Sequence, residues 1–92
     1  MEQLTICIPR VETHVTKEYI VKKFNQLKLG EILQVTDIPL KADADNKRVF
    51  IKIKWNPVTI QGEFIYKRLS SGENIKFVYD TPWYWKLVKS RS

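Results

Sequence analysis

Side chains that could act as nucleophiles, general bases or metal ligands are scarce in this sequence. Cys7 and His14 are its single cysteine and histidine, which excludes an internal disulfide and a zinc site of such ligands. No histidine is placed to activate the Cys7 thiol, and His14 is expected in a solvated loop. The carboxylates are scattered, and the three glycines form no phosphate-binding loop. We therefore predict that the chain is not an enzyme and holds neither a metal nor a cofactor.

A basic and aromatic pattern in residues 47–55 indicates binding chemistry instead. Successive side chains of a strand point to opposite faces, so Val49, Ile51 and Ile53 share one face. The opposite face carries Arg48, Phe50, Lys52 and Lys54. Cations hold phosphates and an aromatic ring stacks on a base, so this face is typical of a surface for single-stranded nucleic acid. The alternative, that a tail or a partner protein covers Phe50, stays open.

The C-terminal segment 81–92 is aromatic and basic. Trp83 and Trp85 would leave an extended chain on one side, and Lys86 adds a cation. The two indoles could extend the stacking surface of Phe50, pack over the domain, or anchor a partner protein. Because a small core needs large apolar side chains, we expect at least one of the two to pack on the domain.

The net charge of +6 is concentrated in the second half of the chain. Residues 1–46 carry six basic and seven acidic side chains, whereas residues 47–92 carry ten basic and three acidic ones. This asymmetry indicates a basic face directed at phosphates, at an anionic membrane or at an acidic protein, and we take the phosphates of RNA or single-stranded DNA as the prediction. The plainer alternative is that the lysines keep a small domain in solution.

The composition is that of one globular domain. A chain of 92 residues with 43% hydrophobic content can form a single compact core. The N-terminus carries Glu2 and lacks the apolar run of a signal peptide, and no stretch approaches the roughly 18 apolar residues of a membrane span. A single cysteine fits a reducing compartment. We therefore expect a protein of the cytoplasm or nucleus without membrane contact, and the residues indicate no particular oligomeric state.

Hydrophobic periodicity predicts four strands and two helices in the order strand, helix, strand, strand, helix, strand. The predicted strands are 4–8, 31–40, 47–55 and 74–79, and the predicted helices are 16–27 and 57–69. Thr16 should cap the first helix, and Gly30 should stop it. Asn56 and Pro57 should begin the second helix.

The inward positions of these elements define a predicted core, which consists of Ile6, Ile8, Ile20, Phe24, Ile51, Ile53, Phe64 and Leu69. Ile60 and Ile65 of the second helix should face inward as well. Residues 41–46 are polar and should form the loop between two strands. Pro82 cannot donate a strand hydrogen bond, so the chain should turn or change partner there.

This order of elements predicts an α+β, ferredoxin-like βαββαβ sandwich. Both helices would cover one face of a four-stranded antiparallel sheet. The other face would stay open. On it the alternation places side chains from three strands, namely Cys7, Arg48, Phe50, Lys52, Lys54 and Lys76.

The pattern resembles the RNA recognition motif (RRM) family over residues 4–80. Residues 15–24, followed by the Gly-Glu-Ile at 30–32, resemble the first helix of that family and the entry to its second strand. Residues 6–11 and 46–53 lie where the family has its short motif and its octamer. The resemblance implies RNA binding by bases that stack on aromatic rings of the sheet.

The sequence departs from the family at several motif positions. Cys7 and Arg48 occupy two of the three positions where the family has a stacking aromatic, so only Phe50 is aromatic there. Lys47 stands where the octamer has glycine. These replacements favour a protein partner. Residues 80–86 resemble, more loosely, small proteins of this fold encoded by large DNA viruses, which would place the protein in a virion.

Together these observations predict an RRM-like domain over residues 1–80 and an extension over residues 81–92. The predicted function is non-catalytic binding of RNA or single-stranded DNA. The predicted site consists of Cys7, Arg48, Phe50, Lys52, Lys54, Lys76, Trp83, Trp85 and Lys86. The alternative is a protein-interaction or structural module, viral or cellular, with a protein partner bound through the C-terminal segment.

Overall fold

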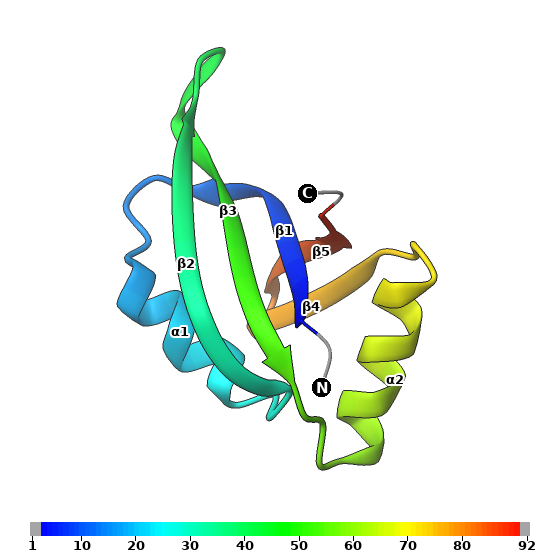
Figure 1. Cartoon of the computed structure of the whole chain (residues 1–92). Helices are drawn as coiled ribbons and strands as arrows, with labels where there is room; N and C mark the ends of the chain where they lie inside the picture. The colour runs from blue at the N-terminus through cyan, green and yellow to red at the C-terminus, as the bar shows by residue number, and fades with distance from the viewer. Residues whose placement is uncertain (1–2, 91–92) are drawn as a thin grey trace.

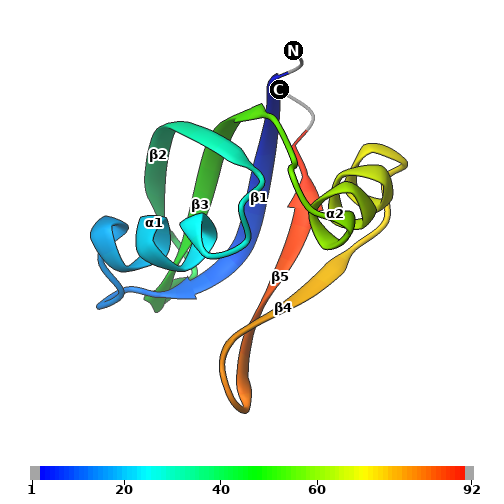
Figure 2. The ribbon, with the colours of Figure 1, turned by 90° about the horizontal axis from the view of Figure 1, so that it is seen from below.

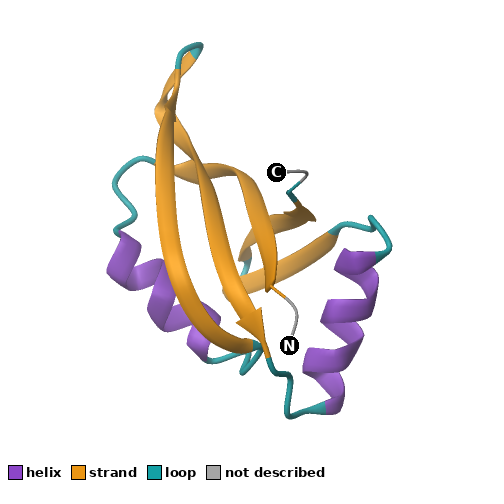
Figure 3. Ribbon diagram, viewed as in Figure 1, coloured by secondary structure: helices purple, strands orange, loops and turns teal. Residues whose placement is uncertain are grey.

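The structure is a computed structural model, and it describes residues 3–90. Within that range the chain forms five strands and two helices (Figure 1, Figure 3). In chain order they are β1 (Gln3–Glu12), α1 (Lys17–Asn25), β2 (Gly30–Leu40), β3 (Asp43–Trp55), α2 (Ile60–Ser70), β4 (Ile75–Asp80) and β5 (Trp83–Lys89).

The described strands form one antiparallel sheet with the order β2-β3-β1-β5-β4. The predicted four-stranded ferredoxin-like sandwich is therefore wrong. In that arrangement the strand after the second helix lies beside β1, whereas here β5 takes that place and β4 lies at the edge. The difference arises because the chain reverses at residues 81–82, so that residues 83–89 pair back on β4. The predicted boundary at residue 80 thus falls at the turn of a hairpin, and the segment expected as an extension supplies a strand.

The sheet bends sharply between β1 and β5. β1 pairs with β3 over most of its length, but with β5 only near Cys7, which lies opposite Val88. The Ser90 N–H adds one hydrogen bond to the Thr5 carbonyl oxygen at 2.8 Å. Figure 2 shows the β4–β5 hairpin extending away from the layer formed by β1, β2 and β3. The bend lets β5 fold its inner side chains toward α1.

The core lies on the inner side of this bent sheet. Seven of the eight predicted core side chains are fully or almost fully buried there. Phe64 is the exception, because 56% of it is exposed. α2 lies beside the β4–β5 hairpin and not over the centre of the sheet, so it buries Ile65 and Leu69 but leaves Ile60 and Phe64 in solvent. The prediction that Ile60 and Phe64 face inward is therefore wrong.

Helix α1 follows the predicted start but not the predicted stop. The Thr16 hydroxyl oxygen accepts a hydrogen bond from the Tyr19 N–H at 3.1 Å, which confirms Thr16 as the N-cap. The helix ends at Asn25, before Gly30. Gly30 begins β2 at a φ of +145°, where a side chain would collide with the Lys54 carbonyl oxygen. The glycine thus permits a close approach of two strands.

Helix α2 begins later than predicted. Thr59 is its N-cap, and the threonine oxygen accepts a hydrogen bond from the Gly62 N–H at 2.9 Å. Asn56 and Pro57 precede the helix and do not cap it. The predicted loop 41–46 is also shorter than expected, because β3 already begins at Asp43. The hairpin between β2 and β3 therefore turns at residues 41–42.

Candidate nucleic-acid interface

The side of the sheet opposite the core gathers most of the predicted site residues. Cys7 lies opposite Phe50 on β3 and opposite Val88 on β5, and Lys76 lies opposite Lys86, so these side chains share one face. We call this surface the outer face, and its described members include Thr5, Cys7, Glu31, Gln34, Thr36, Ile38, Arg48, Phe50, Lys52, Lys54, Lys76, Val78, Tyr84, Lys86 and Val88. Figure 1 looks toward β2, β3 and β1, and neither helix of the described chain crosses this front side.

The cations of the outer face are exposed, and Glu31 of β2 lies opposite Lys54 in the register. Among residues 3–90, no carboxylate forms an ion pair with these side chains, which are Arg48, Lys52, Lys54, Lys76 and Lys86. The Lys76 ammonium lies 4.2 Å from the centre of the Tyr84 ring, a cation–π contact. Lys76 and Lys86 are direct cross-strand neighbours, and like charges in that position repel each other. A bound anion would relieve that repulsion.

The aromatic and thiol groups at the centre of the outer face differ in accessibility. Phe50 is half-buried and lies between Cys7 of β1 and Thr36 of β2 in the register. Cys7 is only 9% exposed, and burial raises the pKa of its thiol, while the charge of Arg48 opposes the shift. The thiol is therefore neutral at neutral pH. Because it is buried, it offers a ligand of the outer face little contact surface.

The two tryptophans of β5 do not join Phe50. Trp83 and Trp85 share the orientation of the core residue Leu87, so they lie on the inner side of the sheet. Trp85 is 3% exposed and stacks on Tyr79 with ring centres 4.0 Å apart. It belongs to the core and cannot stack on a base. Trp83 is 62% exposed but lies at the β4–β5 turn, on the opposite side from Phe50.

Tyr84 is an aromatic of the outer face that the predicted site did not include. It alternates with Trp83 and Trp85 along β5, and about half of it is exposed. The alternation alone places it on the other side of the strand from the tryptophans, so the signal is present in the sequence. Only the pairing of β5 with β1 shows that this other side continues the face of Phe50.

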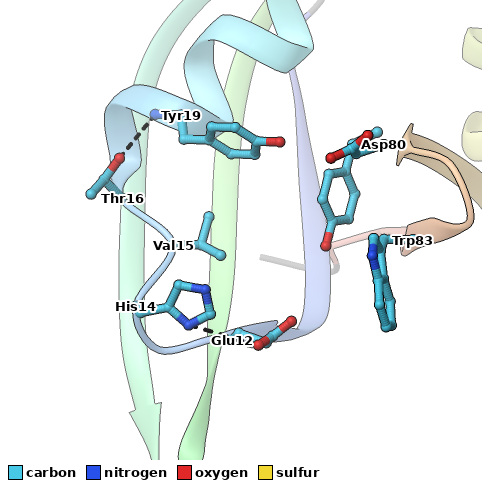
Figure 4. Close-up of a pocket in the computed structure, with 8 residues that line it drawn as sticks. Glu12, His14, Val15, Thr16, Tyr19, Asp80 and Trp83 are labelled. Atoms are coloured by element: carbon cyan, nitrogen blue, oxygen red, sulfur yellow. Dashed lines mark hydrogen bonds and ion pairs between the residues drawn. The ribbon is translucent and has the colours of Figure 1, made fainter.

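A pocket on the inner side lies apart from the outer face. It has a volume of about 430 Å³ and lies between the end of β1, the start of α1 and the β4–β5 turn. Figure 4 shows the residues that line it, which are Glu12, His14, Val15, Thr16, Tyr19, Tyr79, Asp80 and Trp83. His14 is an exposed loop residue, and its Nδ1 lies 3.7 Å from a Glu12 carboxylate oxygen.

The described part of the chain offers no group of three or more His, Cys, Asp or Glu side chains that could hold a metal ion. None of its helices is long and apolar enough to cross a membrane. Comparison of the chain with models of protein families, with curated proteins and with solved structures finds no match.

Proposed function

We propose that this protein binds single-stranded nucleic acid, RNA or single-stranded DNA, through its outer face and without catalysing a reaction. The observation that carries the proposal is the exposure of five cations on the same helix-free face as Phe50, with no described carboxylate in an ion pair with them. Phosphates are the anions that such a surface attracts most strongly.

The half-buried ring of Phe50 favours a single strand over a duplex. A base can stack on a protein ring only when it is not already stacked between its neighbours in a double helix. Phe50 and Tyr84 are the aromatic rings that the outer face presents. With so few rings, phosphate contacts supply most of the affinity, and the sequence preference is weak.

A titration of a labelled single-stranded oligonucleotide of mixed sequence, followed by fluorescence anisotropy, tests the proposal. We expect Phe50→Ala to weaken binding by about 5- to 150-fold, since a base stack contributes about 1–3 kcal/mol. Phe64→Ala is the matched control, because Phe64 is an exposed phenylalanine on α2 and not on a strand of the sheet. Equal effects of the two substitutions, or no binding at low salt, would contradict the proposal.

A protein-interaction module is the second candidate function. Three apolar side chains just before α2 and in its first turns are exposed, and they are Val58, Ile60 and Phe64. Exposed apolar clusters of this kind occur at contacts between proteins. If the oligonucleotide does not bind, this interpretation takes precedence, and the location of the protein in a cell or a virion stays a prediction in both cases.

A further inference from the structure

The pocket between β1, α1 and the β4–β5 turn has walls of aromatic rings. The rings of Tyr19 and Tyr79 meet edge to face, with centres 6.1 Å apart. Trp85 supports both from the core, because it stacks on Tyr79 and meets the Tyr19 ring edge to face, with ring centres 6.3 Å apart. Trp83 lies at the exposed rim (Figure 4). The inner wall is thus held in place by the core, and the indole of Trp83 is free to contact a ligand.

The same pocket is acidic although the chain as a whole is basic. Glu12 and Asp80 line it, and no lysine or arginine does, in a chain that contains 16 of them. The pKa of the Tyr79 hydroxyl is raised. The largest cause is burial, followed by the electrostatic effects of Glu12, Tyr19 and Asp80. Both carboxylates therefore act on one hydroxyl of the pocket wall, and the nearby Lys23 ammonium lies over the Tyr19 ring, 5.4 Å from its centre.

We infer that this pocket binds an organic cation, either a methylated ammonium or a guanidinium group. Aromatic faces attract such cations because the ring carries negative charge above its plane, and quaternary ammonium groups are bound in this way. The carboxylates add attraction, and a volume of about 430 Å³ accommodates a small molecule or a side chain of a partner. The inference does not depend on the proposed nucleic-acid function, since an acidic pocket repels phosphates.

The test uses the whole chain labelled with nitrogen-15 and follows the indole N–H signal of Trp83 by NMR. Trp83→Phe identifies that signal. The probes are choline and N-acetylarginine amide, and the matched neutral probe is 3,3-dimethyl-1-butanol, which has the shape of choline without its charge. We expect at least one charged probe to shift the Trp83 signal in a saturable manner, while the neutral probe does not. The tighter charged probe shows whether the head group is an ammonium or a guanidinium.

Substitutions in the pocket provide the second measurement. Glu12→Gln combined with Asp80→Asn should weaken binding of the charged probe by about threefold to tenfold, the effect of two solvent-exposed charge pairs. In the variant that lacks the Trp83 indole, the backbone N–H signal of Tyr79 reports binding instead. Trp83→Ala should weaken binding, whereas Tyr84→Ala should not, because Tyr84 is also about half exposed but lies on the opposite face of β5. Equal binding of the charged and neutral probes, or no binding of either, would overturn the inference.

Discussion

The ammonium group of Lys47 lies inside the protein, where only 7% of the residue is exposed. It donates hydrogen bonds to the Val15 carbonyl oxygen at 2.6 Å and to a carboxylate oxygen of Asp37 at 3.0 Å. A buried charge without a partner is strongly destabilising, so the two acceptors are what permits a lysine at this position. The contact joins β3, β2 and the segment before α1.

Asp37→Asn should lower the free energy of unfolding at neutral pH by about 1–3 kcal/mol, because it removes the negative charge that accepts a hydrogen bond from the buried Lys47 ammonium. The Lys47 hydrogen bond holds the pKa of the Asp37 carboxyl below its ordinary value of 3.8. Because the pKa is lower in the folded protein, the ionised carboxylate stabilises the fold at a pH above the ordinary value. This contribution is lost as the pH falls from the ordinary value through the lowered pKa. The difference between the two proteins should therefore shrink only below a pH of 3.8.

Denaturant unfolding at several pH values measures this difference. Lys17→Gln is the control, because Lys17 is a more exposed partner of Asp37 at 3.8 Å. Its effect should stay below about 1 kcal/mol, as for other surface ion pairs. A loss of stability from Asp37→Asn that equals that of the control, or that persists unchanged in acid, would show that the Lys47 contact contributes little.

At the scale of the elements, β5 connects the two parts of the sheet. It pairs with β4 along the hairpin and with β1 near Cys7, and it contributes Trp85 and Leu87 to the core. Its sequence alternates large apolar and polar side chains. This pattern fits a strand in the middle of a sheet as well as an extended tail. The tertiary pairing is what makes one of its tryptophans a core residue and leaves the other at a rim.

Trp85→Ala should destabilise the protein by about 3–5 kcal/mol, the cost of removing a large buried aromatic side chain. Trp83→Ala should cost less than about 1 kcal/mol, because the indole is mostly in solvent. Thermal unfolding followed by circular dichroism compares the two. The pair is well matched, since the same side chain is removed at two positions of one strand. A larger effect at Trp83 would contradict the placement of β5 in the sheet.

At the scale of the whole molecule, charge is divided between two sides. The outer face carries exposed cations, whereas the pocket on the inner side is lined by Glu12 and Asp80. The net charge of +6 therefore understates the local positive potential of the outer face. The two surfaces should select ligands of opposite sign.

Neutralising Lys52 and Lys54 together should weaken oligonucleotide binding and reduce its salt dependence. Each lost phosphate contact lowers the slope of log affinity against log salt by about 0.7 for a single strand, so Lys52→Gln with Lys54→Gln should reduce it by about 1.4. Titrations between about 50 and 200 mM salt measure the slope. Lys22→Gln with Lys67→Gln removes the same charge from exposed positions on α1 and α2. If both pairs reduce the slope equally, binding is a general effect of charge and not a property of the outer face.

Much of the local structure was predictable from the sequence alone. The alternation of Val49, Ile51 and Ile53 with the basic residues of β3 defined which side chains are buried, and Thr16 defined the start of α1. Such features depend on neighbours within a few residues, because a strand repeats every two residues and a cap acts within one turn. The basic composition of the outer face was visible for the same reason.

The tertiary structure decided the partners of the strands and the fate of particular side chains. Residues 83–89 have the same alternation whether they pair with β4, with β1 or with another protein, so the sequence could not define the fifth described strand. Phe64 fits the inward face of a helix, yet it is exposed because α2 lies beside the β4–β5 hairpin. The pocket joins residues far apart in the chain, Glu12 with Asp80, and only long-range packing brings such residues together.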